Sequence, residues 1–464
     1  GNIEDCAVTV MQEAQILVSY KVYKPKLEPV PKPADAIPAP EKLKTTEELY
    51  LAATHLEQYR HATREPADYY RHGLELDGTD IRLNNGYGLL LYRRGQIKES
   101  IRHFRAAVKK QTWKNPNPYH GEGYFNLGLA LAADGQEEKA FDAFYKSTWS
   151  AETQSAGFFW LARLACRRGD YEEALEYIEK SLIRNWHNMK VRALKASILR
   201  KLGRCNKDFL AESLAIDPLS LDCLYEKAVT EDNLEAWIKT MRISAHNYLE
   251  VALDYIKAGL YEDAVRILDA TPDKTPMTWY YMGYAYAKNG KIEDALDAYQ
   301  KAEQSNPDYC FPNKMEEILI LNAAISALKK APYAHYYLGC LLYDKKQYDK
   351  AVNEWEESIS ENPKYAMAYR NLAIAYYNKC KEPAKALAYM KQAIQGLKNE
   401  IKNLGNVNVN AIEEYKSVSE RYEFLKTQHD DLVEAEASLV KIIEELDIAM
   451  RQQFQEQFAR IRSE

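Results

Sequence analysis

Apolar residues recur at helical spacing between Trp279 and Pro307, where the pattern is clearest in the chain. The spacing predicts two helices joined by a turn at Asn289-Gly290, because glycine tolerates the left-handed conformation that ends a helix. The first helix has an apolar face formed by Trp279, Met282, Gly283 and Tyr286. The second has one formed by Ala295, Tyr299 and Ala302. One such hairpin cannot bury these faces alone, so the pattern predicts neighbouring hairpins of the same kind.

Similar hairpins recur along the chain when it is aligned on glycines between paired apolar segments. These turn glycines are Gly95, Gly135, Gly169, Gly203, Gly259 and Gly290. The pattern resembles the tetratricopeptide repeat, a helical hairpin of about 34 residues. Residues 219–244 fit it poorly and are interpreted as degenerate helices, and Met315–Leu328 is interpreted as a helical insertion. About eight units over residues 46–397 predict an all-α, right-handed superhelical solenoid.

The chain ends differ from this array. Residues 15–23 alternate apolar and polar side chains, which predicts a single strand left from a domain absent from this sequence. A proline-rich connector follows, and residues 1–45 form the first segment. Residues 398–464 predict a long helix with coiled-coil spacing. Its apolar seam runs through Tyr415, Val418, Tyr422, Leu425, His429, Leu432, Glu436, Leu439, Ile443, Leu446 and Met450.

The composition argues against a nucleic-acid-binding, a membrane-spanning or a disulfide-bonded protein. The 464 residues carry 62 Lys and Arg against 68 Asp and Glu, so a net charge of −6 gives no broad basic field for nucleic acid. No apolar run reaches the length of a membrane span. Seven scattered cysteines without CxxC spacing indicate buried thiols in a reducing compartment, and we expect a cytoplasmic protein.

Five segments resemble a bacterial family in which tetratricopeptide repeats follow a mutarotase-like β-sandwich of unassigned function. They are His55–Arg64, Asp80–Arg94, Asn115–Tyr119, Asn185–Asn188 and Pro307–Asn313. In that family the β-sandwich implies a carbohydrate context. Because only its last strand would remain here, the resemblance implies no sugar-directed activity for this chain.

The segment Leu404–Leu432 is similar to the C-terminal coiled-coil arm of bacterial SMC chromosome-condensing ATPases. The resemblance covers about the last 67 residues and ends before the ATPase head. No GxxxxGK[ST] phosphate loop occurs in the chain. Two unrelated families meeting near residue 397 indicate a chimera, an engineered fusion or a gene-assembly accident, and the sequence does not choose among these.

Catalytic and metal-binding motifs are weak throughout. His55 and His61 lie six residues apart, about 120° around a helix, so they do not chelate a metal from one face. Acidic pairs such as Glu137-Glu138 begin second helices, where they favour the positive end of the helix dipole. We therefore expect no enzymatic activity, no cofactor and no metal.

The concave groove of the solenoid is the better candidate site, because first helices line it. The residues expected there are Arg82, Asn85, Tyr92, Arg93, Phe125, Arg163, Arg167, Arg200, Tyr280, Tyr284, Tyr336 and Tyr343. The basic members suit a carboxylate or phosphate on a peptide, and the tyrosines suit an extended aromatic ligand or a sugar. Alternatively, the arginines are solvated and the tyrosines pack between repeats.

These observations predict a non-enzymatic scaffold that binds a protein or peptide segment in its groove. One alternative is the accessory half of a carbohydrate-active or carbohydrate-binding protein, and another is a chromosome-associated protein acting through the SMC-like tail. We expect no membrane association and no direct contact with nucleic acid. We expect the C-terminal coiled coil either to pair two chains as a homodimer or to fold back as an antiparallel hairpin partner.

Overall fold

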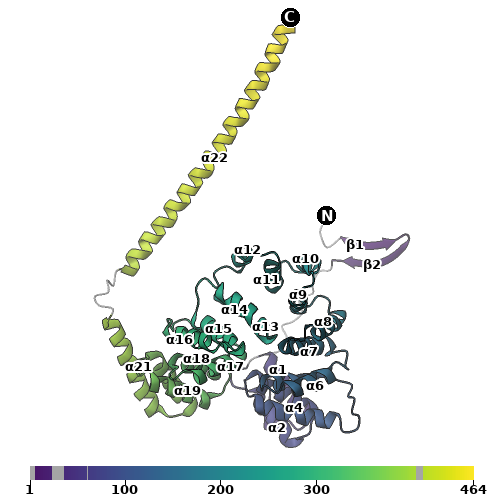
Figure 1. The fold of residues 1–464 in the computed structure, drawn as a ribbon, viewed down its shortest axis with the longest axis vertical. Coiled ribbons are helices and arrows are strands. Elements are labelled where there is room, and N and C mark those ends of the chain that lie inside the picture. The colour runs from purple at the N-terminus through teal and green to yellow at the C-terminus, as the bar shows by residue number, and fades with distance from the viewer. Residues whose placement is uncertain (1–5, 23–35, 60, 404–410, 464) are drawn as a thin grey trace. The chain divides into compact units, whose positions relative to one another are not determined.

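The structure is a computed structural model that describes residues 6–22, 36–59, 61–403 and 411–463. Antiparallel helical hairpins dominate it (Figure 1). The first four hairpins are α1 (Thr46–Gln58) with α2 (Pro66–Leu76), α3 (Ile81–Arg93) with α4 (Ile97–Gln111), α5 (Glu122–Ala133) with α6 (Glu137–Ser147), and α7 (Gln154–Arg168) with α8 (Tyr171–Arg184). The next four are α9 (Met189–Lys201) with α10 (Lys207–Ile216), α11 (Leu221–Thr230) with α12 (Leu234–Met241), α13 (Ala245–Lys257) with α14 (Tyr261–Asp269), and α15 (Pro276–Lys288) with α16 (Ile292–Gln304).

A single helix, α17 (Glu316–Ala327), follows these hairpins at the position of the expected insertion. Two more hairpins complete the array: α18 (Pro332–Asp344) with α19 (Tyr348–Glu361), and α20 (Ala366–Ala375) with α21 (Pro383–Asn403). The last helix is α22 (Ala411–Ser463). The chain divides into two compact units, residues 1–328 with 344–347 and residues 329–343 with 348–464.

The turn glycines predicted from the sequence have the expected backbone conformation. All six have positive φ, between 68° and 78°. At Gly290, for example, the left-handed residue ends α15 and lets the chain reverse into α16. A side chain would strain this conformation, so the glycine pattern locates the turns correctly.

A second set of glycines explains how closely the paired helices pack. Gly88, Gly128, Gly283 and Gly339 each lie in a first helix, and an aromatic residue follows each of them 16 positions later in the second helix. A Cβ added at these glycines would lie only 2.4–2.7 Å from the ring of Phe104, Phe144 or Tyr299, or from that of Trp355. The aromatic ring of the second helix therefore occupies the space where the first helix has no side chain.

The stretch from 219 to 244, which fits the repeat pattern poorly, forms a hairpin of short helices. Its turn carries Asp232 at φ 53° where six other hairpins carry glycine, so alignment on turn glycines does not find this repeat. Trp237 is only 2% exposed and donates a hydrogen bond from Nε1 to the carbonyl oxygen of Leu221 at 3.1 Å. The indole therefore fastens α12 to the start of α11.

The two ends of the chain depart partly from the sequence expectations. The expected strand is present as β2 (Gln15–Lys21), but it pairs antiparallel with β1 (Ala7–Gln12) and is not a single strand. Most of the proline-rich connector lies outside the described residues. The helix α21 runs through residue 397 to Asn403, while the start of the SMC-like stretch, 404–410, also lies outside the described residues.

Candidate functional site

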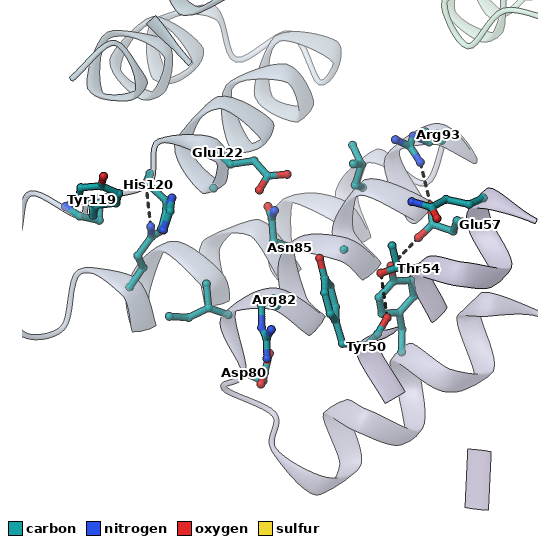
Figure 2. A pocket seen from close by; sticks show the side chains of 18 of the residues that line it. Tyr50, Thr54, Glu57, Asp80, Arg82, Asn85, Arg93, Tyr119, His120 and Glu122 are labelled. Carbon is teal, nitrogen blue, oxygen red and sulfur yellow. Dashed lines mark hydrogen bonds and ion pairs between the residues drawn. The ribbon is translucent and has the colours of Figure 1, made fainter. Parts of the chain in front are cut away.

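A cavity with a volume of about 790 Å³ lies against the first helices of three consecutive hairpins. Tyr50, Thr54 and Glu57 line it from α1, at steps that keep them on one helical face. The helix α3 contributes Arg82, Asn85, Leu89 and Arg93 in the same way, and α5 contributes Glu122 and Gly123. We call this the α1–α3–α5 cavity (Figure 2).

Two arginines of the cavity form ion pairs with the preceding hairpin. Arg93 Nη1 lies 2.8 Å from Glu57 Oε2, and Arg82 pairs with Glu47. The side chains of Arg82 and Arg93 are still 51% and 59% exposed. Each guanidinium has five donors, so donors remain for a ligand. Exposed ion pairs of this kind contribute little stability, and a ligand carboxylate can compete with the glutamates.

The middle of the cavity is polar and has a fixed amide. Asn85 Oδ1 accepts a hydrogen bond from Asn126 Nδ2 at 3.0 Å, which orients the amide of Asn85. The side chains of Asn85 and Glu122 point toward one another from neighbouring helices (Figure 2). Tyr119 and His120, from the loop before α5, form the outer wall, and Tyr119 is 88% exposed. The cavity thus offers amide, carboxylate, guanidinium and aromatic groups within one hollow.

Three other predicted groove residues line a separate cavity of about 320 Å³. They are Tyr92 from α3, Arg167 from α7 and Tyr284 from α15. Arg167 is held on two sides: Nη1 lies 2.7 Å from Glu137 Oε1, and Nε donates to the carbonyl oxygen of Lys257 at 2.9 Å. Burial raises the pKa of the Tyr92 and Tyr284 hydroxyls, so both remain neutral donors at physiological pH.

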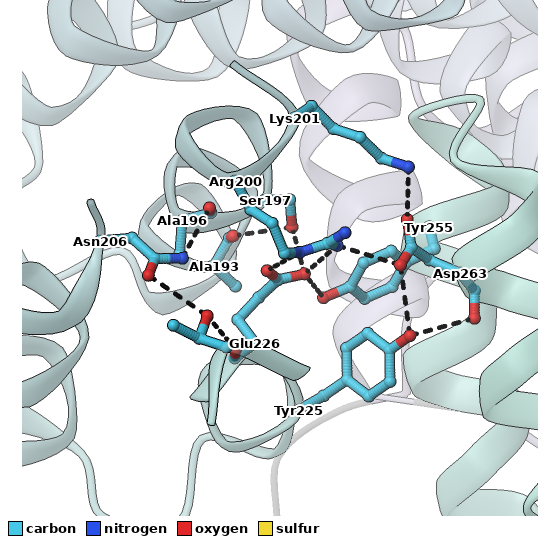
Figure 3. A network of polar contacts seen from close by, with 11 residues as sticks. Ala193, Ala196, Ser197, Arg200, Lys201, Asn206, Tyr225, Glu226, Tyr255 and Asp263 are labelled. Atoms are coloured by element: carbon cyan, nitrogen blue, oxygen red, sulfur yellow. Dashed lines mark hydrogen bonds and ion pairs between the residues drawn. The ribbon is translucent and has the colours of Figure 1, made fainter. Parts of the chain in front are cut away.

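The expectation that Arg163 and Arg200 form a basic groove floor is wrong. Arg163 is 7% exposed, and its Nη2 lies 2.9 Å from Asp254 Oδ1 on α13. Arg200 binds the fully buried carboxylate of Glu226, with Nε 2.8 Å from Oε2 (Figure 3). Arg163 on α7 meets an acidic residue 91 positions later in the chain, and Arg200 on α9 meets Glu226 in the next hairpin, so both arginines are neutralised.

Four of the aromatic candidates contact other side chains of the solenoid, although Phe125, Tyr336 and Tyr343 are only partly buried. Tyr280 is fully buried and donates its hydroxyl hydrogen to Glu303 at 2.6 Å, so its assignment to the groove is wrong. Trp279 and Tyr286, expected in the core, are only partly buried. Phe125 packs against Phe144, Tyr336 against Tyr365, and Tyr343 against Tyr348 and Trp355. Tyr336 contacts Tyr365 at the start of the next hairpin, as the alternative of packing between repeats expects, whereas Phe125, Tyr280 and Tyr343 contact residues of their own hairpins.

Several lining residues were missed in the sequence, although a signal for some of them was present. Glu57 and Arg93 are 36 residues apart, and Glu47 and Arg82 are 35 apart, close to one repeat length. Aligning α1 with α3 would therefore have brought each acid beside its arginine. Tyr119 and His120 gave no such signal, because they lie in the loop between α4 and α5 and not at a repeat position of a helix.

The ion pairs of Asp254 predict a dependence of stability on pH. Burial alone would raise the pKa of Asp254, but Arg163 and Lys190 outweigh it and hold this pKa below its ordinary value. An aspartate whose pKa is lower in the folded state than in the unfolded state stabilises the fold. This contribution is fully present at pH values above the unfolded-state pKa of about 3.9, and it is lost as the pH falls through the folded-state pKa. We expect Asp254→Asn to be less stable at pH 7 and to lose less further stability on acidification.

Urea midpoints measured at neutral pH and below about pH 4 test this expectation. Asp273→Asn, at an exposed position, is the matched control and should keep the pH dependence of the wild-type chain. Equal pH dependence in Asp254→Asn and Asp273→Asn would contradict the role given to the Arg163 and Lys190 pairs.

Two other features, a metal-ligand cluster and a membrane-spanning helix, are absent from the described ranges. No three histidine, cysteine, aspartate or glutamate side chains there come together in a way that could hold a metal ion. None of the described helices combines the length and hydrophobicity of a membrane span. The expectation of buried thiols is wrong for Cys6 and Cys205, which are exposed.

Comparisons with known proteins confirm the repeat class. Models described as "Tetratricopeptide repeat" match residues 88–152 and 276–309, and one described as "TPR repeat" matches 339–379. A tetratricopeptide-repeat protein from Parabacteroides merdae is 15% identical, with a TM-score of 0.37 over 61% of this chain and 97% of that structure. PilF from Pseudomonas aeruginosa is 13% identical, with a TM-score of 0.30 over 56% and 90%. Both TM-scores are below 0.5, so the repeat class rests on the matches to the family models.

A short part of the chain is similar to chromosome partition protein Smc. The protein from Halothermothrix orenii is 44% identical over 73 residues, and that from Bacillus subtilis is 41% identical over 73 residues. In both cases the match covers 16% of this chain and 6% of the relative. The SMC resemblance is thus confirmed as a partial one, while the relation to a mutarotase-like family stays a prediction.

Proposed function

We propose that this tetratricopeptide-repeat chain is a protein-interaction scaffold that binds an extended, carboxylate-bearing peptide in the α1–α3–α5 cavity. The carrying observation is the convergence of Arg82, Asn85 and Arg93 on one cavity face, with both guanidiniums half exposed. Arginine binds carboxylates through paired hydrogen bonds, and repeat solenoids present concave surfaces to extended ligands. A volume of about 790 Å³ is in the range that holds a drug-sized ligand.

Each group in the cavity has a role in this proposal. Arg82 and Arg93 bind a carboxylate from an acidic side chain or from the peptide C-terminus. Asn85 pairs with the peptide backbone, because its amide is already oriented by Asn126 and carries both a donor and an acceptor. Tyr119, with its exposed ring, packs on an apolar side chain of the ligand at the outer wall.

The test is to select binders from a random peptide library on the full-length chain and to measure their affinity by calorimetry. We expect selected peptides to carry a carboxylate, and Arg93→Ala or Asn85→Ala to weaken binding by about tenfold or more, since hydrogen bonds to charged groups contribute about 1.5–3 kcal/mol. Arg102→Ala, on the exposed surface of α4, is the matched control and should leave affinity unchanged. Selected peptides that bind the Arg93 and Asn85 variants as tightly as wild type would rule out this cavity.

The two alternatives from the sequence stay predictions. The carbohydrate alternative depends on a domain absent from this sequence. The chromosome alternative rests on a similarity that spans 6% of the length of the relatives.

A further inference from the structure

The helix α22, which has 53 residues, exposes a mainly apolar seam that is interrupted by His429 and Glu436. Its positions follow one another at alternating steps of three and four, which is the spacing of coiled-coil core positions a and d. The apolar members are 54–73% exposed: Tyr415, Val418, Tyr422, Leu425, Leu432, Leu439, Ile443, Leu446 and Met450. A contiguous apolar surface of this length is typical of an interface and unusual for a surface open to water.

We propose that this seam pairs with the same seam of a second copy of the chain, and that the two helices run antiparallel. The charges on α22 decide the orientation. With Tyr415 at position a, the later a positions include His429 and Glu436, while Arg421 falls at g and Lys426 at e. These four residues make a parallel pair of helices unfavourable.

In a parallel, in-register pair each core residue faces its own copy. Two Glu436 carboxylates would then meet in the core, and two His429 rings would meet two turns earlier. Arg421 of one helix would also lie beside Lys426 of the other, because g and e positions flank the core together. Like charges desolvated in a core cost free energy, so the parallel arrangement is disfavoured.

In an antiparallel pair each a residue faces a d residue of the partner, so no Glu436 meets its own copy. The register centred on residue 434 pairs the seam from Val418 to Met450 and places Tyr415 opposite Gln453 of the second copy. It places Tyr422 opposite Leu446, Ile443 opposite Leu425, and Met450 opposite Val418 of the second copy. Lys426 then flanks Asp447 of the second helix, which replaces the like-charge contact by an ion pair.

The polar centre of the seam gains a role in this register. His429 faces Leu439 and Glu436 faces Leu432, while His429 of one copy and Glu436 of the other lie in adjacent core layers. Polar residues at single a positions fix the register of a coiled coil at some cost in stability. The seam is therefore apolar toward both ends, and its polar middle fixes the register of the pair.

Disulfide trapping in the full-length chain tests the orientation, with the exposed Cys6 and Cys205 replaced by serine. Ala435→Cys lies next to its own copy only in the antiparallel register, and Leu425→Cys faces its own copy only in a parallel pair. We expect covalent dimers from Ala435→Cys and none from Leu425→Cys. Crosslinking of Leu425→Cys, or of neither variant, would overturn the proposal.

Light scattering on the same chain tests the association itself. Wild type should have the mass of a dimer at micromolar concentration, and Leu439→Asp, which places a charge in the seam, should halve that mass. Lys441→Asp introduces the same side chain on the outer face and should remain dimeric. A monomeric wild type, or a dimer unaffected by Leu439→Asp, would overturn the proposal independently of any peptide binding in the α1–α3–α5 cavity.

Discussion

Replacing Glu226 by alanine is expected to destabilise the first unit by about 3–5 kcal/mol, the cost of breaking a buried ion pair by removing one partner. The Glu226 carboxylate is fully buried and accepts hydrogen bonds from Ser197 Oγ at 2.7 Å and from the Tyr255 hydroxyl at 2.6 Å. It also accepts two from Arg200, at 2.8 and 2.9 Å. Without the carboxylate, a largely buried guanidinium keeps only Asp263 as its acidic partner.

Two measurements give this loss of stability: the urea midpoint of unfolding, and amide hydrogen exchange in α9, α11 and α13. These three helices carry Glu226 and its hydrogen-bond partners. Glu179→Ala is the matched control, since Glu179 is 55% exposed and lies 3.2 Å from Lys195. Removing such a surface pair should cost no more than about 1 kcal/mol. Adding Arg200→Leu to Glu226→Ala should recover part of the stability, because it removes the unpaired charge. Equal midpoints for Glu226→Ala and Glu179→Ala would contradict the importance of the network.

Phe144→Ala is expected to cost about 3–5 kcal/mol, as for other fully buried aromatic residues. The Phe144 ring is fully buried, stacks on Trp160 with centroids 5.3 Å apart, and fills the space beside Gly128. Gly128→Ala should also destabilise the chain, because its Cβ would lie 2.7 Å from that ring. In the Phe144→Ala background, Gly128→Ala is instead expected to stabilise the chain. There the added methyl group enters the space that the ring has left, and alanine has a higher helix propensity than glycine.

A double-mutant cycle on Gly128 and Phe144 measures this change of sign in urea unfolding. Tyr145→Ala removes a neighbouring ring that is 47% exposed and should cost much less than Phe144→Ala. Additive effects of the two substitutions would show that the glycine and the ring do not share one space. The same reasoning applies to the other glycine and aromatic pairs with a spacing of 16 residues.

The residues of the α1–α3–α5 cavity could be predicted from the sequence only in part. Arg82, Asn85 and Arg93 were predicted together because their spacing places them on one face of one helix, which is a local property. Arg163 lies on a first helix in a comparable pattern, yet it is buried against Asp254, 91 residues later. No local spacing distinguishes these arginines, because what differs is the helix that the solenoid brings against each of them.

The sequence alone determined the hairpins, the turns at the positive-φ glycines and the continuous heptad spacing of α22, because these depend on contacts within a few residues or one repeat. The tertiary structure alone decided which first-helix side chains remain open to a ligand. Stacking of the hairpins places α7 against α13 and Arg200 against Glu226 and Asp263. It leaves the α1–α3–α5 cavity open, with Arg82 and Arg93 half exposed. Charges meet both between neighbouring hairpins, as for Arg200 and Glu226, and between hairpins further apart in the sequence, as for Arg163 and Asp254.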